Sequence, residues 1–476
     1  MKNYLPFFAA FFLLGLSACE KTPSEKQQIE GVWASLGYGK IIQIEGEQYA
    51  FYDVTKISCL PDEQGSLNSF GGDLSLKNDT LQLVKGISSY YYTRIDDLPD
   101  LCKGAISESQ KQNPEYNFAV FANTIEEHFA YFKRNKINWD SLHQIYKSQV
   151  TATTSEPELY LILDEMLSAL KDNHGYLEPS DSVYEQALLL EKEEDSVPKE
   201  TPQKEYGDLT IAQIAAEHYL DEDLTRDSRF MTWGKIKDHI AYIQVKTMWL
   251  YADFGIPDSL IQKNGFVDPY LEASSQMTEA EYVKKEVEGV RALLDRILKD
   301  LKDTHYLILD VRFNGGGQDA VSREILRRFN SSRTPIAAKK AVHKAAYTTP
   351  TTLYMEGSDN TYQKPVFLLT SQQSASATDF MALASLELPN VKRIGMHTNG
   401  ALSDAMEKTL PNGWYFSISN EIYTDLKGNC YESIGIPVDY ELGYPEDRQT
   451  FFRLVANDLA GDKAKVLQAI ETFDLQ

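Results

Sequence analysis

The pattern of hydrophobic and polar positions changes several times along the chain. From residue 28 to 112, short runs alternate apolar and polar side chains, and turns rich in Gly, Asn and Asp separate them. Such alternation is typical of antiparallel strands joined by hairpins. The clearest runs are Lys40–Ile44, Gln48–Tyr52 and Thr80–Val84. The pattern predicts a small all-β domain over residues 28–112, as a barrel or a sandwich.

Helical spacing replaces this alternation over residues 113–180. Apolar side chains recur there at intervals of three and four in two stripes, which predicts a helical subdomain. The stripes are Phe118, Phe121, Ile125, Phe129 and Phe132, and then Tyr160, Leu163, Met166, Leu167 and Leu170. Residues 181–206 are acidic and contain two prolines, Pro198 and Pro202, so we expect a solvated linker there.

From residue 207 to 476, strand-like apolar runs alternate with helical stretches. This alternation is typical of a sheet with flanking helices. The strongest predicted strands are His239–Val245, Tyr306–Val311 and Val366–Thr370, and a long helical stretch lies between Trp249 and Asp303. We therefore expect an α/β core with a mixed sheet, preceded by the helical subdomain and the all-β domain.

The N-terminus has the pattern of a secretory signal. A short basic region is followed by an apolar run, Leu5–Leu16, that is too short to span a membrane. Leu16-Ser17-Ala18-Cys19 then resembles the lipobox of bacterial lipoproteins. That resemblance implies a lipoprotein signal peptide over residues 1–18, lipidation of Cys19 and a tether over residues 19–27. An ordinary signal peptide with an incidental cysteine is the alternative.

Composition and charge narrow the range of partners. The chain has 476 residues, of which 42% are hydrophobic and 25% charged, as in an ordinary globular protein of two or three domains. Its formal charge of −23 argues against nucleic acid, because neutralising phosphates requires a basic surface.

The cysteines fit a protein of an oxidising compartment. If Cys19 is lipidated, Cys59 and Cys102 are the pair predicted to form a disulfide, since both lie in the small β-domain. Cys430 is then the remaining thiol. Neither the cysteine spacing nor the histidines suggest a metal site.

One stretch has the features of a nucleophile turn. Ser374–Phe380 lies between the apolar run Val366–Thr370 and a predicted helix that begins at Phe380. A hydroxyl at this position faces unpaired N–H groups and the positive end of the helix dipole, which suits a serine that forms an oxyanion. A helix cap that packs small residues is the other interpretation.

Three further features could complete a catalytic site. Gly315-Gly316-Gly317 follows the strand Tyr306–Val311 and forms either an oxyanion-binding loop or a plain turn. His174 stands at a helix end before Gly175, either as a packing residue or with its ring presented by a sharp turn. Glu432 lies between a turn and a strand that ends in proline.

In this order along the chain, these features resemble the tail-specific, or C-terminal-processing, serine proteases. The branches of that superfamily include the tricorn core protease and the interphotoreceptor retinoid-binding protein. The resemblance covers about residues 115–445 and implies a crotonase-like α/β core. Asp310–Gly317 is similar to the family's Asp-x-Arg-x-Asn-x-Gly-Gly motif, and Ser374–Asp379 is similar to its nucleophile motif. Arg393–Gly400 is similar to the Gly-x-x-Thr-x-Gly motif, and Tyr431–Asp439 to the Glu-Gly-x-Gly-x-x-Pro-Asp motif.

The resemblance implies a role for several residues. The nucleophile corresponds to Ser376, with Ser374 as the competing assignment. The oxyanion hole would be formed by the N–H groups of Ala377 and of one glycine in the loop, Gly316.

The same resemblance selects the base. One branch uses a lysine after the Thr-x-Gly turn, where this chain has Ala401. The tricorn-like branch instead uses a histidine and a late glutamate, for which His174 and Glu432 stand at the matching places. The residue before the histidine is a serine in the tricorn enzyme and is Asn173 here.

The implied protein is a serine endopeptidase that cleaves peptide or protein substrates by acyl-enzyme chemistry without a cofactor. It would be lipid-anchored in the bacterial cell envelope, at the outer membrane, on its periplasmic or surface face. A catalytically silent member that binds a peptide or an apolar ligand is the alternative, and an esterase would differ only in its substrate. The oligomeric state is not predicted.

Overall fold

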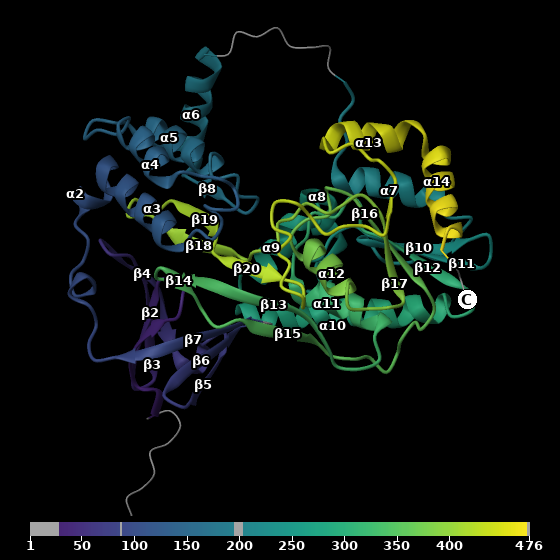
Figure 1. Ribbon diagram of the computed structural model, residues 1–476, viewed down its shortest axis with the longest axis horizontal. Coiled ribbons are helices and arrows are strands. Elements are labelled where there is room, and N and C mark those ends of the chain that lie inside the picture. The colour runs from purple at the N-terminus through teal and green to yellow at the C-terminus, as the bar shows by residue number, and fades with distance from the viewer. Residues whose placement is uncertain (1–27, 86–87, 195–202, 474–476) are drawn as a thin grey trace, which may run out of the picture.

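The computed structural model describes residues 28–85, 88–194 and 203–473. Three parts are visible in Figure 1: a β-domain in purple, a helical subdomain in blue, and an α/β core that extends from teal to yellow. The predicted signal peptide, Cys19 and the tether at residues 19–27 lie outside the described residues. None of the described helices is long and apolar enough to cross a membrane.

The β-domain is one antiparallel sheet of seven strands, in the order β4-β3-β2-β1-β7-β6-β5. Its alternating side chains form a core of their own, centred on Trp33, Phe51 and Leu81. Lys85 of β6 lies 5.9 Å from the ring of Phe51 of β3 and 3.7 Å from Glu63 of β4, so the single sheet curls around its core, closer to the predicted barrel than to a sandwich. The strands are β1 (Gly31–Ser35), β2 (Lys40–Glu45), β3 (Gln48–Val54), β4 (Cys59–Ser66), β5 (Asp73–Lys77), β6 (Thr80–Lys85) and β7 (Ser88–Ile95).

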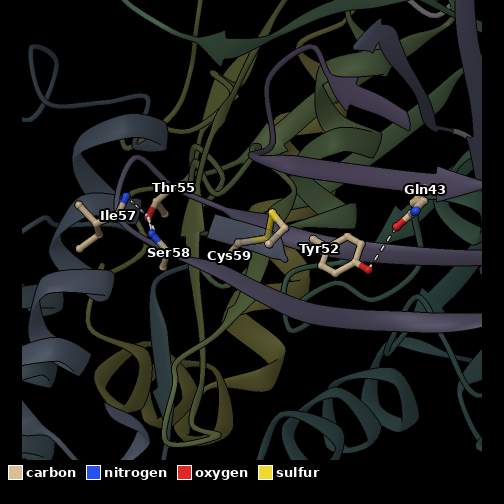
Figure 2. Close-up of a disulfide and its surroundings, with 7 residues drawn as sticks. Gln43, Tyr52, Thr55, Ile57, Ser58 and Cys59 are labelled. Carbon is tan, nitrogen blue, oxygen red and sulfur yellow. Dashed lines mark hydrogen bonds between the residues drawn. A yellow bond between two sulfur atoms is a disulfide. The ribbon is translucent and has the colours of Figure 1, made fainter. Parts of the chain in front are cut away.

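A disulfide joins Cys59 and Cys102, the pair that the sequence predicts. It ties the start of β4 to the segment that leads from the β-domain into the helices. Figure 2 shows the turn before Cys59, where Thr55 Oγ1 accepts the N–H groups of Ile57 and Ser58 at 3.3 and 3.1 Å. Cys430 is the free cysteine of the described residues.

The helical subdomain shares its core with a β-hairpin that comes from far along the sequence. Strand β8 (Tyr176–Glu178) pairs with β19 (Tyr415–Ser419), and β19 pairs with β18 (Ala405–Thr409), so the sheet order is β18-β19-β8. Phe121 and Phe416 pack with ring centroids 4.9 Å apart. The helices are α2 (Glu108–Lys111), α3 (Pro114–His128), α4 (Trp139–Lys147), α5 (Glu156–Ser168) and α6 (Asp181–Glu194).

Helix α6 corrects the prediction of a solvated linker over residues 181–206. Residues 181–194 are helical, and residues 195–202 lie outside the described part. Val183 and Ala187, four positions apart, are buried against the core of the subdomain. The prediction was wrong for this segment because its many acidic residues lie on a helix that needs only a narrow apolar stripe to pack.

The α/β core is built on a mixed sheet, as predicted. Its order is β21-β17-β16-β12-β11-β10-β9, in which β11, β12, β16 and β17 are parallel and β10 is antiparallel to β11. The strands are β9 (Glu222–Asp223), β10 (Met231–Ile236), β11 (Ile240–Val245), β12 (Tyr306–Asp310), β16 (Val366–Thr370), β17 (Val391–Gly395) and β21 (Tyr440–Glu441).

Helices cover both faces of this sheet. Leu307 and Leu309 face one helical layer, and Ile308 faces the other, because successive side chains of a strand point to opposite faces. The first layer holds α10 (Glu279–Asp300), α11 (Asp319–Leu326) and α12 (Ala377–Ser385), and the second α7 (Asp208–Tyr219), α13 (Arg448–Asn457) and α14 (Leu459–Glu471).

Smaller elements complete the core. Strand β13 (Thr334–His343) pairs with β14 (Ala346–Tyr347), β15 (Thr351–Met355) and β20 (Glu421–Thr424), and it runs toward the β-domain in Figure 1. Helices α8 (Asp258–Asn264) and α9 (Val267–Ser274) replace the start of the single long helical stretch that the sequence predicts.

A buried ion-pair network fixes the end of β12, from which the glycine loop starts. Arg312 is fully buried and binds Asp310 Oδ2 at 2.8 Å and Asp462 Oδ2 at 2.7 Å. Tyr444 accepts a further hydrogen bond from the guanidinium at 2.8 Å. Because Asp462 belongs to α14, the network holds this strand end against the C-terminal helices.

Candidate active site

Ser376 is placed by the turn between β16 and α12. It is the residue before the helix, it is half-buried, and its φ of 57° and ψ of −120° lie in a region that residues with a side chain rarely adopt. Its N–H donates to Asp379 Oδ2 at 2.9 Å, which holds the turn. Strained backbone of this kind is a feature of serine nucleophiles on strand-to-helix turns.

Ser374 has a different environment. It is fully buried, its hydroxyl donates to the carbonyl of Val311 at 2.9 Å, and it accepts the N–H of Ser371 at 3.1 Å. Both functions of the hydroxyl are therefore used within the fold. The geometry favours Ser376 as the nucleophile.

The glycine loop lies directly against this turn. A Cβ added at Gly316, whose φ is 108°, would be 2.7 Å from Ser376 Cβ and 2.7 Å from the carbonyl oxygen of Ala375. Only glycine fits there.

The N–H groups of the two predicted oxyanion donors differ in their hydrogen bonding. Ala377 is the first residue of α12, so its N–H has no partner within the helix. The N–H of Gly316 donates to Asn314 Oδ1 at 2.9 Å. Gly316 thus lies against Ser376 with its N–H bound to Asn314, and a change at Asn314 would be needed to release it.

Two carboxyl groups hold the loop that follows the nucleophile helix. Asp379 accepts the N–H groups of Gly400 at 2.8 Å and Ala401 at 3.0 Å. Glu432 Oε2 accepts the next two, from Leu402 at 2.9 Å and Ser403 at 3.0 Å. Four consecutive N–H groups are therefore fixed by two side chains, one of which also holds Ser376.

Burial raises the pKa of both carboxyl groups. The pKa of Glu432 is raised to about 8, because desolvation outweighs the hydrogen bonds from Leu402 and Ser403. The pKa of Asp379 is raised to about 6 for the same reason, against four hydrogen bonds that lower it. At neutral pH, Glu432 is consequently protonated in most molecules.

His174 lies on the turn between α5 and β8. Asp172 fixes this turn, because its Oδ1 accepts the N–H of His174 at 3.1 Å and its Oδ2 accepts the N–H of Ser419 at 2.7 Å. Among the described residues, the buried ring nitrogen Nδ1 has no hydrogen-bond partner. Burial lowers the pKa of His174, opposed by Asp172, Asp404 and the backbone of Ser403. The imidazole is therefore neutral at neutral pH, as a base must be.

The histidine turn is joined to the nucleophile loop by asparagines. Asn173 Nδ2 donates to Asn399 Oδ1 at 2.9 Å, and the N–H of Asn399 donates to the carbonyl of Ser374 at 2.9 Å. No hydrogen bond within the described residues links His174 to Ser376 or to Glu432.

The roles of Asp379 and Asn399 were not predicted from the sequence. Asp379 stands in the nucleophile motif, three positions after Ser376, where a carboxylate is favoured at the start of a helix. That spacing could have indicated its bond to the N–H of Ser376. The bond between Asn173 and Asn399 had no sequence signal, because the two residues are 226 positions apart. Across the part of the chain that the structure describes, no cluster of three or more His, Cys, Asp or Glu could hold a metal ion.

A serine on a strand-to-helix turn, beside a glycine loop in an α/β core, is the arrangement of hydrolases with a serine nucleophile. The family model described as peptidase family S41 matches residues 239–442, and the model of the tricorn protease C1 domain matches residues 110–168. The chain belongs to the tail-specific proteases of family S41.

Solved structures agree with this fold. A putative peptidase from Parabacteroides merdae ATCC 43184 is 22% identical, with a TM-score of 0.51 over 73% of this chain and 97% of that one. Mature CPAF is 10% identical, with a TM-score of 0.52 over 77% of this chain and 99% of that one. At such identities the likeness shows the fold alone. No curated protein matches the chain.

Replacing Ser376 by glycine should stabilise the protein relative to replacing it by alanine. Both variants lack the hydroxyl, but only glycine adopts the φ of 57° without strain. We expect Ser376→Gly to have the larger free energy of unfolding, by about 1 kcal/mol. Urea unfolding followed by circular dichroism measures the difference, and equal stabilities would show that the turn is not strained.

Replacing Glu432 by glutamine should change how stability depends on pH. The pKa of a glutamate is ordinarily 4.5, and in the folded protein that of Glu432 is about 8. Between these two pH values the folded parent keeps a proton on Glu432 that the unfolded chain has released. The free energy of unfolding of the parent therefore falls as the pH rises, and Glu432→Gln lacks this contribution.

The variant should accordingly gain stability relative to the parent between pH 5 and pH 8. Urea unfolding at both pH values tests this. Glu178→Gln, an exposed change on β8, is the control and should show no such trend. A constant difference between parent and Glu432→Gln would contradict the raised pKa.

Proposed function

We propose that this protein is a serine endopeptidase of the tricorn-like type, with Ser376 as nucleophile and His174 as general base. The observation that carries the proposal is the position of Ser376, on a strained turn at a helix start and in contact with Gly316. Ala401 supports the choice of base, because the lysine of the other branch is missing at this place.

The chemistry is acyl transfer. Ser376 Oγ attacks the carbonyl carbon of the scissile peptide bond while its proton passes to His174. The oxyanion of the tetrahedral intermediate accepts hydrogen bonds from the N–H of Ala377 and from the glycine loop. The C–N bond then breaks as His174 returns the proton to the leaving amine. Water, activated by His174, finally hydrolyses the ester.

Two local changes would assemble this machinery when substrate binds. His174 and Ser376 must approach to hydrogen-bond distance, and catalytic hydrogen bonds are often long in the free enzyme. Gly316 N–H must turn from Asn314 to the substrate oxygen. The arriving oxyanion, which carries a full charge, is the stronger acceptor.

Glu432 has a supporting role in this proposal. Its bonds to Leu402 and Ser403 place it behind the loop, and the backbone of Ser403 lies beside His174. With a pKa raised to about 8, it is mostly uncharged at neutral pH. We propose that it positions the loop, and that Asn173 holds the histidine turn through Asn399 in place of a tetrad serine.

The cellular location is part of the same proposal. A lipid anchor at Cys19 would attach the protein to the bacterial cell envelope, at the outer membrane. The disulfide between Cys59 and Cys102 supports an oxidising compartment. A crotonase-like class for the α/β core is likewise the finer assignment that we propose.

Labelling with a fluorophosphonate probe tests the catalytic proposal. The parent should be labelled, Ser376→Ala should not, and His174→Ala should be labelled about a hundredfold more slowly, since general-base assistance is lost. Ser374→Ala is the matched control and should keep the label. Circular dichroism confirms that each variant is folded.

The outcome also separates the two candidate functions. A folded parent that takes no label would make the protein a silent member that binds a peptide or an apolar ligand. Labelling that survives in Ser376→Ala but is lost in Ser374→Ala would overturn the choice of nucleophile.

Replacement of Cys19 tests the anchor. Expressed in a Gram-negative host with labelled palmitate, the full chain should incorporate the label and sediment with the membranes. Cys19→Ala should do neither, whereas Cys430→Ala should behave as the parent. Membrane association without Cys19 would argue for an attachment of another kind.

A further inference from the structure

A cavity of about 320 Å³ lies between the β-domain and the hairpin of β18 and β19. All five residues of β18, Ala405–Thr409, line it. Successive side chains of a strand point to opposite faces, so a cavity that touches five residues in a row must follow the edge of the strand. The cavity therefore exposes the backbone of β18.

That edge is unpaired within the described residues. Strand β18 hydrogen-bonds to β19 on one side and is the outermost strand of its sheet. An edge strand presents a row of N–H and C=O groups that can pair with an added strand. Here the cavity leaves room for one.

One residue in the wall of the cavity has a buried donor without a partner. Asn420, which is 1% exposed, lines it, and its Nδ2 makes no hydrogen bond within the described part of the chain. Buried amide groups are nearly always hydrogen-bonded in native proteins. A backbone carbonyl of a bound peptide would satisfy this donor.

The cavity begins close to the candidate nucleophile. The N–H groups of Ser376 and Ala401 bind the same oxygen, Asp379 Oδ2. Asp404, which lines the cavity, is three residues after Ala401 and so lies within about 11 Å of it along the chain. The charge of Asp404 also raises the pKa of His174, against the effect of burial. A strand added to β18 would therefore lead to the catalytic turn.

The lining is acidic. Three lysines face six carboxyl groups, so the cavity has an excess of negative charge. All three lysines are already paired: Lys408 with Asp53, Lys40 with Asp53 and Asp62, and Lys85 with Glu63. Asp404 is paired with Lys339, so Glu279 and Glu407 carry the negative charge for which no ion pair is seen within the described residues. The carboxyl residues are Asp53, Asp62, Glu63, Glu279, Asp404 and Glu407. A peptide with basic side chains is the complementary occupant.

We propose that this cavity binds a basic segment of the peptide substrate, extended as an additional strand on the free edge of β18. The proposal rests on the proposed peptidase function and names its substrate class. Five residues of strand span about 17 Å, so about five substrate residues would bind. The β-domain is then a wall of the substrate site.

Binding to the full-length Ser376→Ala variant tests this without turnover. Fluorescein-labelled octapeptide pools, one rich in Lys and Arg and a matched one rich in Asp and Glu, are compared by fluorescence anisotropy. We expect the basic pool to bind at least tenfold more tightly. Members of that pool are then N-methylated at one position at a time. Methylation should weaken binding tenfold or more at alternate positions only, because every second N–H of an added strand faces β18.

Variants in the same background test the two recognising groups. Asn420→Ala should weaken binding of the basic peptide about tenfold, and Glu407→Gln should weaken it severalfold at low salt. Glu178→Gln removes the same charge from the opposite edge strand, β8, and should leave binding unchanged.

Equal binding of both pools, or a loss on methylation without alternation, would overturn the proposal. So would unchanged binding in Asn420→Ala. The fluorophosphonate result is independent of these measurements, so a labelled enzyme without the alternation retains its peptidase function and loses only this substrate site. If methylation weakens binding at alternate positions but the fluorophosphonate probe does not label the parent, the result supports peptide binding at β18 and rejects the peptidase function.

Discussion

Two buried carboxyl groups hold four consecutive N–H groups, and the candidate active site depends on this constraint. Asp379 binds Gly400 and Ala401 and also the N–H of Ser376, so the nucleophile turn and the loop share one acceptor. Glu432 continues the same series. Burying a carboxylate is costly, and the raised pKa of both groups reflects that cost. The four N–H groups of the loop donate hydrogen bonds to these carboxyl groups, and the bonds offset part of the cost of burying them.

The base that we propose, His174, comes from another part of the chain. Ala401 stands where the other branch of the family has its lysine base. Its N–H is bound to Asp379, and its buried side chain has no ionisable group. Strand pairing supplies the alternative: Tyr176 lies opposite Ser417, which brings the preceding His174 turn to the hairpin. Asp172 completes the attachment at Ser419. The turn that carries His174, the proposed base, is thus positioned by a sheet formed between segments more than two hundred residues apart.

Local signals in the sequence predicted much of this, and long-range contacts account for the rest. Apolar runs predicted the central strands of the mixed sheet, and the glycine run indicated a loop whose backbone allows a close approach, as Gly316 makes to Ser376. Helix α6 was missed because acidic composition hid a narrow apolar stripe. The bond between Gly316 and Asn314, and the pairing of β8 with β19, depend on side-chain geometry and distant partners that no local pattern encodes.

Strand β8 covers one edge of the hairpin, and the β-domain is attached beside the other. Lys408 reaches from β18 to Asp53, and both side chains are buried. Removing Asp53 would leave the buried ammonium of Lys408 without a counter-ion, whereas Asp53 is also paired with Lys40. Lys408 makes this contact with its side chain, while the outer backbone edge of β18 remains unpaired within the described residues. This contact, one of several between the two parts, uses a side chain of β18 and leaves the backbone edge of the strand unpaired beside the candidate catalytic loop.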